Sequence, residues 1–285
     1  MPDLLIVNKK NFEEKKKQFI EGGLNKIHIL SDFDRTLTKA FVNGEKTPSL
    51  ISELRRRNYI SEEYSKSAQA LADKYHPIEI DTSIPLAKRK KAMHEWWTKH
   101  FELLIKSGLN KKHLEQIIKE GIIQIREGSL ELLDFLHNHN IPLVIMSSAG
   151  LGSDSISMFF QKYRKMYNNI YIISNVYEWD KNGNAKRVKE PIIHCMNKDE
   201  TIVKDYPQIF KKIEDRKNVL LLGDSIDDID MIKGFDYKTL IKIGFLNENI
   251  EANLKAYKNT YDIIILNDGK MEYIKRLLKE IGCKE

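Results

Sequence analysis

The stretch Lys26-Ile27-His28-Ile29-Leu30-Ser31-Asp32-Phe33-Asp34-Arg35-Thr36-Leu37-Thr38 decides how the chain is interpreted. Its first half is a short apolar run of the kind that forms a buried strand. Asp32 and Asp34 follow where this run stops, and alternation along an extended segment places them on one side with Phe33 opposite. In open α/β sheets, chemistry takes place beyond the carboxyl ends of the strands. We therefore expect a buried strand that ends in two carboxylates at a candidate site.

Two carboxylates that share a site cannot both be readily ionised, so we expect their surroundings to push their pKa values apart. One can then stay anionic as a nucleophile or metal ligand while the other donates a proton. A lone Asp-x-Asp pair is more often an ordinary exit from a strand into a loop. The rest of the chain has to decide between these interpretations.

Length and composition narrow the classes of protein. The 285 residues can hold one large α/β domain or a core with an insertion, and 41% hydrophobic residues suffice for a core. The net charge of +6 fits a small anionic substrate as well as a lysine-rich surface. The sequence has no arginine-rich stripe interleaved with aromatic residues, which argues against a nucleic-acid partner.

Cysteine content and the ends of the chain bear on location. Cys195 and Cys283 cannot build a disulfide framework and lack metal-ligand spacing, which indicates a reducing compartment. The N-terminus lacks a basic-then-apolar signal, and no apolar run approaches ~18 residues. We expect a cytoplasmic protein with no membrane partner; the oligomeric state stays open, with a monomer as the simplest expectation.

The chain order predicts a core interrupted by a helical insertion. Asn11 could cap a helix over residues 12–22, and the strand with the two aspartates follows. From about residue 43 to 126 the periodicity is helical, with helix starts at Thr47-Pro48 and Ser61 and further helices over 85–106 and 110–121. We expect a discontinuous catalytic core, residues 1–43 and 127–285, and a helical cap domain, residues 44–126.

Beyond residue 127, strands and helices alternate again, which predicts a parallel sheet covered on both faces. Asn182-Gly183 predicts a small β-hairpin flap within 175–190. The expected helices are 128–139 and 154–166; the expected strands are Ile141–Met146, Ile170–Ile173, Val219–Leu222, 239–243 and 262–266.

Polar groups follow several of these elements. Ser148-Ala149-Gly150 could hold a phosphate through a hydroxyl and backbone N–H groups, although a serine N-cap is the simpler alternative. Lys198 could neutralise phosphate charge, whereas most lysines are solvated surface. The segment from Gly223 to Asp230 carries four acids, which is more than an Asx turn or helix cap needs and suits Mg²⁺.

These motifs together resemble haloacid dehalogenase-like phosphatases. Asp32-Phe33-Asp34-Arg35-Thr36, Ser148, Lys198 and Gly223 to Asp228 fall in order as the four motifs of that superfamily. The resemblance narrows to the cytosolic pyrimidine 5′-nucleotidase family, including its 7-methylguanosine-phosphate branch. That narrower resemblance extends from about residue 10 to the C-terminus and rests on Tyr75–Asp81, Glu95–Lys99, Ser148–Gly152 and Lys242–Asn247.

The resemblance implies a fold and a reaction. The fold is α/β, a Rossmann-like haloacid dehalogenase core with a parallel sheet, a helical cap and a β-flap. Asp32 would attack the phosphorus of a nucleoside 5′-monophosphate and form an aspartyl-phosphate. Asp34 would protonate the leaving ribose oxygen and then deprotonate water. Mg²⁺ would sit on the Asp32 carboxylate, the Asp34 backbone carbonyl and Asp224.

The resemblance also implies substrate contacts. Ser148, the Ala149 backbone and Lys198 would hold the phosphoryl oxygens, and Asp228 would orient Lys198 or a metal-bound water. Glu79 would contact the base, and in an extended segment it would face the pocket with the flanking isoleucines on the other side.

Several residues depart from the pattern. Arg35, Ser153 and Asp227 stand where close relatives more often carry Met, Asp and Gly, and His100 replaces a small residue near the base. Trp97 could stack on the base or simply pack, and two adjacent tryptophans are not expected to point the same way. The double tryptophan resembles the 7-methylguanosine branch, so we expect 7-methylguanosine and cytidine monophosphates to be cleaved faster than uridine and adenosine monophosphates.

Two alternatives stay open. A capped phosphatase for another small phosphomonoester would share the core chemistry. A phospho-acceptor signalling domain would also use an aspartate, Mg²⁺ and a lysine, but without an inserted cap. A nucleotide-binding module without catalysis is disfavoured because both aspartates and Lys198 are present.

Overall fold

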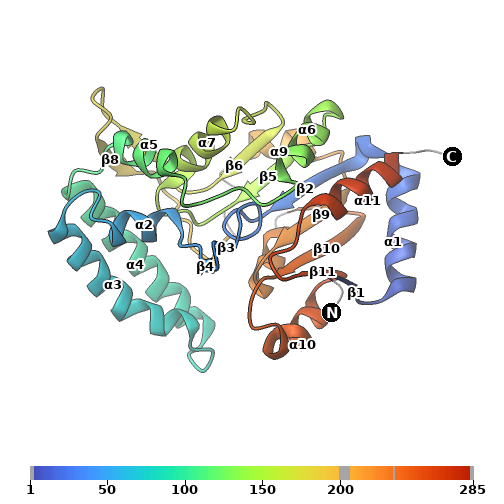
Figure 1. The fold of residues 1–285 in the computed structure, drawn as a ribbon, viewed down its shortest axis with the longest axis horizontal. Helices are drawn as coiled ribbons and strands as arrows, with labels where there is room; N and C mark the ends of the chain where they lie inside the picture. The colour runs from blue at the N-terminus through green and yellow to red at the C-terminus, as the bar shows by residue number, and fades with distance from the viewer. Residues whose placement is uncertain (1–2, 199–205, 234, 283–285) are drawn as a thin grey trace.

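A seven-stranded sheet forms the centre of the computed structural model (Figure 1). The structure describes residues 3–198, 206–233 and 235–282, and Cys283 lies outside these ranges. Its order is β1-β11-β10-β9-β2-β5-β6, and every neighbouring pair is parallel except β1 with β11. The strands are β1 Leu4–Ile6, β2 Ile27–Ser31, β5 Leu143–Met146, β6 Ile170–Ile173, β9 Asn218–Gly223, β10 Thr239–Leu246 and β11 Ile263–Leu266. The expected α/β fold with a parallel-dominated sheet is confirmed.

Both faces of this sheet are covered, because its strands are apolar on both sides. Along β9, Leu220 and Leu222 pack into one core cluster while Val219 and Leu221 pack into another. The first cluster includes side chains of α1 Lys9–Gly22, α6 Ser129–Asn138, α7 Gly152–Lys162 and α11 Glu272–Gly282. The second includes side chains of α9 Pro207–Ile213, α10 Ile250–Thr260 and the 3₁₀ segment η2 Ile226–Ile232.

Four helices follow one another between β4 and α6. They are α2 Leu50–Arg56, α3 Glu62–Ile80, α4 Leu86–Lys106 and α5 Lys111–Glu120. The long helices α3 and α4 pack side by side and project away from the sheet (Figure 1). Contacts of α5 with α7 and of α4 with β8 join this helical block to the rest of the molecule.

Two small hairpins flank the helical block. The hairpin β7 Tyr177–Trp179 with β8 Ala185–Val188 lies within the expected flap. The hairpin β3 Phe41–Val42 with β4 Glu45–Lys46 was not expected, because two-residue strands have no apolar pattern. The strand β1 was also missed: three residues pair with the distant β11, and nothing local marks that pairing.

Several helix boundaries differ from expectation. Asn8, not Asn11, caps α1, and Ser49, two residues after Thr47, caps α2 by accepting from the Ser52 N–H. Helix α7 ends at Lys162 rather than near 166. The extended conformation considered for Tyr75–Asp81 is wrong: α3 continues through Pro77 to Ile80.

Candidate active site

The carboxylate pair lies at the end of β2, as expected. Phe33 is fully buried against the edges of Phe159 and Phe160, with ring centroids 5.4 and 5.9 Å away. The Asp32 N–H donates to the Leu222 carbonyl at 3.0 Å, which extends the β2–β9 contact by one residue. This anchoring of Phe33 leaves the side chains of Asp32 and Asp34 lining one cavity.

The turn after β9 is organised by Asp228. Its Oδ2 accepts from the backbone N–H groups of Asp224 and Ser225, at 3.0 and 2.9 Å. Gly223 makes this possible, because a Cβ built there would lie 2.5 Å from the Asp228 Cβ. The close approach brings the acidic turn onto the end of β2.

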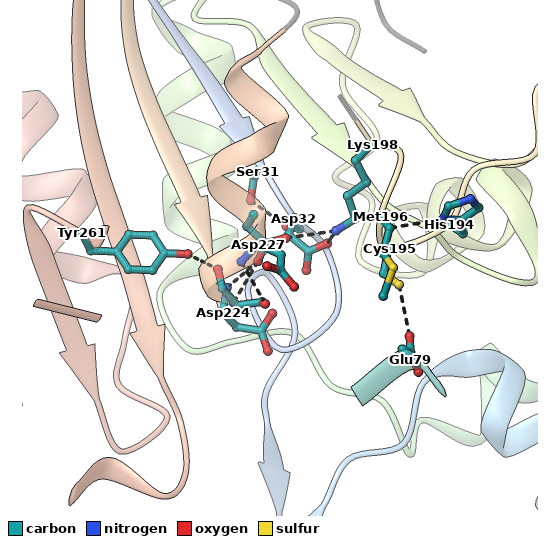
Figure 2. Close-up of polar contacts among 12 residues, drawn as sticks. Ser31, Asp32, Glu79, His194, Cys195, Met196, Lys198, Asp224, Asp227 and Tyr261 are labelled. Carbon is teal, nitrogen blue, oxygen red and sulfur yellow. Dashed lines mark hydrogen bonds and ion pairs between the residues drawn. The ribbon is translucent and has the colours of Figure 1, made fainter. Parts of the chain in front are cut away.

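Lys198 joins the two acidic segments. Its Nζ lies 2.6 Å from Asp32 Oδ1 and 3.1 Å from Asp228 Oδ1, and the side chain is nearly buried. Figure 2 shows the lysine reaching Asp32 from the loop that also carries Cys195. Burial lowers the pKa of Lys198, but the charges of Asp228 and Asp32 favour the ammonium more strongly. The pKa of Lys198 is therefore raised.

Three carboxylates form a cluster that could hold a metal ion. Asp32, Asp224 and Asp228 each offer an oxygen, and these atoms lie within 4.8 Å of one another. Burial raises the pKa of Asp32 to about 7, with Lys198 acting in the opposite direction. Burial, followed by the charge of Asp228, raises the pKa of Asp224 well above its usual value. Asp32 and Asp224, whose raised pKa disfavours ionisation in the free protein, are donors that a hard divalent cation would stabilise.

Asp34 differs from Asp32 in its contacts. It lines the same cavity, and burial raises its pKa while the Arg35 guanidinium lowers it. The pKa of both acids is therefore raised, so the expected separation of the two values stays a prediction.

The cavity has a volume of about 770 Å³, within the range of small-molecule sites. It brings together nearly all of the sequence-predicted residues: Asp32, Asp34, Glu79, Trp97, His100, Ser148, Lys198, Asp224 and Asp228 line it. The predicted Ala149 is buried directly after Ser148 and is not among the lining residues. Of the departures from the family pattern, Arg35 and Asp227 also line the cavity.

Aromatic rings line the end of the cavity formed by α3 and α4. Trp97 stacks on Trp96 at 6.1 Å and on His100 at 5.9 Å. Both tryptophans line the cavity, so the expectation that adjacent tryptophans point apart is wrong. His100 Nε2 lies 3.0 Å from the Tyr64 hydroxyl, and burial lowers the pKa of His100 to about 4. The imidazole is therefore neutral at neutral pH.

Sequence reasoning missed Arg126, which fixes the backbone after the carboxylate pair. The side chain is buried, and its guanidinium donates to the carbonyls of Arg35 and of Thr36 and pairs with Asp268 at 2.8 Å. Arg35 itself adopts a left-handed backbone conformation, with φ 57°. Nothing in the sequence around Arg126 distinguishes it from a surface arginine.

Sequence reasoning missed other cavity residues as well, among them Arg55, His76 and Cys195. The first two are polar residues on helices, a pattern typical of solvated faces. Cys195 was considered only for disulfides and metal ligands, and it is a free cysteine.

Known proteins resemble this chain in sequence and in fold. Residues 35–282 match the family model of pyrimidine 5′-nucleotidase (UMPH-1). The chain is 34% identical over 262 residues to the 7-methylguanosine phosphate-specific 5′-nucleotidase of Gallus gallus, covering 92% of this chain and 90% of that protein. The crystal structure of cytosolic 5′-nucleotidase IIIB bound to cytidine superimposes with a TM-score of 0.88 at 28% identity, covering 99% of this chain and 94% of that one.

A more distant structure shares the fold alone. A HAD family hydrolase from Salmonella enterica subsp. enterica serovar Typhi has a TM-score of 0.59 at 17% identity, covering 90% of this chain and 72% of that one.

Among the described residues, no helix has both the length and the apolar character needed to cross a membrane.

Proposed function

We propose that this chain, which belongs to the pyrimidine 5′-nucleotidase (UMPH-1) family, cleaves pyrimidine nucleoside 5′-monophosphates, 7-methylguanosine monophosphate or both. It is a phosphoric monoester hydrolase with a Rossmann-like haloacid dehalogenase core. One observation carries this proposal: Asp32, Asp34, Asp224 and Lys198 line one end of a cavity whose other end is aromatic. Such a cavity offers a phosphate a charged end and a base a flat apolar end.

We propose that one part of the chain carries out catalysis and another part selects the substrate. Residues 1–43 and 127–285 would form the catalytic core, and residues 44–126 the cap that selects the substrate. The proposal is supported by the placement of Glu79, Trp97 and His100 on α3 and α4, whereas the acids and Lys198 lie at or near the ends of the sheet strands.

The acidic cluster would hold Mg²⁺. Asp32 and Asp224, with the Asp34 backbone carbonyl, would be the ligands, and Asp228 would orient Lys198 or a metal-bound water. Mg²⁺ favours a few carboxylates and retains waters, which suits this oxygen-only set. When bound, it would neutralise charge on the transferring phosphoryl group.

The reaction would proceed in two steps on Asp32. A carboxylate oxygen of Asp32 would form a bond to phosphorus as the bond from phosphorus to the ribose O5′ breaks, and Asp34 would give its proton to O5′. Water would then attack the aspartyl-phosphate after losing a proton to Asp34, which frees Asp32 and phosphate. Lys198, Ser148 and the Ala149 N–H would hold the phosphoryl oxygens throughout.

The base would be read by the cap. Glu79 can accept from the exocyclic amine of cytosine and from the ring N–H and exocyclic amine of guanine. An indole such as Trp97 attracts a cationic methylated purine by ~0.5–2 kcal/mol beyond ordinary stacking. The indole therefore supports a preference for 7-methylguanosine monophosphate, and the preference for cytidine over uridine and adenosine monophosphates stays a prediction.

A phosphate-release screen tests the proposed function. Cytidine, uridine, adenosine and 7-methylguanosine 5′-monophosphates would be compared with phosphoserine and sugar phosphates, with Mg²⁺ and with excess chelator. We expect metal-dependent cleavage of nucleotides, fastest for the cytidine and 7-methylguanosine substrates. Cleavage confined to phosphoserine or a sugar phosphate, or full activity in chelator, would contradict the proposal. Equal cleavage of all four nucleotides would contradict the base-reading roles. A cytosolic location and a monomeric state stay predictions.

A further inference from the structure

A hydrogen bond links Cys195 to the carboxylate expected to read the base. Cys195 Sγ lies 3.1 Å from Glu79 Oε1, although the two residues are 116 positions apart in the chain. Figure 2 shows the thiol pointing from the Lys198 loop toward Glu79 at the end of α3. Burial raises the pKa of Cys195, and the charge of Glu79 adds to this effect. The thiol therefore stays protonated and donates a hydrogen bond to the carboxylate.

The other oxygen of Glu79 is also occupied. Glu79 Oε2 lies 2.9 Å from His76 Nδ1, one turn earlier on α3. A carboxylate has about four acceptor positions, so these two contacts fix its plane and leave positions for a ligand. Both Glu79 and Cys195 line the cavity, and the free acceptor positions can therefore be offered to a bound base.

The loop that carries Cys195 is held by its own hydrogen bonds. Asn197 Oδ1 accepts from the His194 N–H at 2.7 Å, and Asn197 Nδ2 donates to the Ile192 carbonyl at 2.8 Å. The same loop delivers Lys198 to Asp32 three residues after Cys195. One braced loop thus contacts both the nucleophile, through Lys198, and Glu79, through Cys195.

We propose that Cys195 is a positioning residue for base recognition. Its thiol orients Glu79 toward the N–H donors of the base. The same contact fixes the distance between the Glu79 carboxylate and Lys198, which holds the phosphate. This role rests on the proposed 5′-nucleotidase function and assigns a residue outside the catalytic acids to substrate choice. A base with an amine donor benefits from the oriented carboxylate, and a phosphoester without a base does not.

Substitutions at position 195 test the role by a split between substrates. In Cys195→Ala, we expect KM for cytidine monophosphate to rise about 3- to 10-fold, the range of one hydrogen bond, with kcat little changed. Hydrolysis of p-nitrophenyl phosphate, which has no base, should be unaffected. Cys195→Ser keeps a donor and should restore most of the nucleotide KM, whereas Cys195→Val, which fills the space without a donor, should not.

A double substitution excludes a general packing effect. In a Glu79→Ala background, Cys195→Ala should add no further increase in KM, because its only route to the base has been removed. Nucleotide cleavage with unchanged KM in Cys195→Ala, or equal losses on both substrate types with no rescue by serine, would overturn this role alone. A wild-type protein that cleaves p-nitrophenyl phosphate but no nucleoside monophosphate would overturn the proposed function and this role with it.

Discussion

Asp34 and Asp32 lie two residues apart and line one cavity. Of these two acids, only Asp32 accepts a hydrogen bond from Lys198 among the described contacts. That contact suits an acid that stays anionic and attacks phosphorus, since an ammonium stabilises the charged form. Burial raises the pKa of both acids, so the contact with Lys198, and not the pKa values, distinguishes the two. The assignment of Asp32 as nucleophile and Asp34 as acid and base stays a prediction, which the Lys198 contact supports.

Asp34→Asn separates these roles by leaving group. Asparagine cannot donate the proton that a ribose oxygen needs, so single-turnover phosphorylation of the enzyme by cytidine monophosphate should slow by about 10²–10⁴-fold. p-Nitrophenolate leaves without protonation, so phosphorylation by the aryl phosphate should slow much less. Rapid-quench measurements on both substrates check this, and equal losses would contradict the assignment.

His100 makes the stability of the protein depend on pH. Its pKa is about 4 in the folded protein and about 6.5 when unfolded, so between these values the unfolded chain binds more protons. The contribution is fully present above pH 6.5 and is lost as pH falls toward 4. By pH 5 the free energy of unfolding should fall by about 2 kcal/mol through this residue.

Urea unfolding of wild type and His100→Asn at pH 7.5 and 5 measures that contribution. The variant cannot titrate at this position, so its stability should fall less between the two pH values. His28, whose pKa burial also lowers to about 4, is present in both proteins and cancels in the difference. An identical pH dependence of the two proteins would show that the imidazole is not buried as described.

At the scale of the element, the turn from β9 into η2 shapes the proposed metal site. A Cβ on residue 223 would lie 2.7 Å from Asp228 Oδ2, so alanine there must displace Asp228 from the Asp224 and Ser225 N–H groups. Gly223→Ala should therefore raise the Mg²⁺ concentration for half-maximal activity roughly 10- to 100-fold, as loss of an orienting partner typically does.

A second alanine substitution serves as the control. A Cβ at Gly22, on α1, would meet first the side-chain amide of Asn218, which is the end of a side chain. Gly22→Ala should leave the Mg²⁺ dependence as in wild type. Metal titrations of phosphate release on both variants, each with a folded circular dichroism spectrum, decide the question; an unchanged Mg²⁺ requirement in Gly223→Ala would contradict the account of the turn.

The elements divide clearly into those that local sequence predicts and those it does not. The strands β2, β5 and β9 are apolar runs that end in polar residues, and each was predicted from those features. The end of α3 was not, because proline usually interrupts a helix, and Pro77 lies inside this one. β1 and the Cys195 contact depend on partners far away in the chain, which no local pattern reports.

At the scale of the whole molecule, the site is assembled between two groups of elements. The strands of the sheet bring the acids together, and the block of helices α2–α5 supplies the aromatic end of the cavity. The acidic end could be predicted from motif order, since parallel strands end at one edge. The aromatic end could not be predicted in the same detail: Arg55 and Cys195 become neighbours of Glu79 and Trp97 in the cavity only through tertiary packing.

The central claim is that Asp32 carries the phosphoryl group between substrate and water, and trapping that intermediate tests it most directly. The enzyme would be mixed with p-nitrophenyl phosphate and Mg²⁺, quenched in acid, reduced with borohydride and digested for mass spectrometry. Asp34→Asn, which should slow the hydrolysis of the intermediate, would be treated in parallel with Asp32→Asn. Reduction of an aspartyl-phosphate yields homoserine, which we predict at position 32 in wild type and in Asp34→Asn and nowhere in Asp32→Asn. Homoserine at another aspartate, or turnover by Asp32→Asn at a rate near that of wild type, would contradict the account.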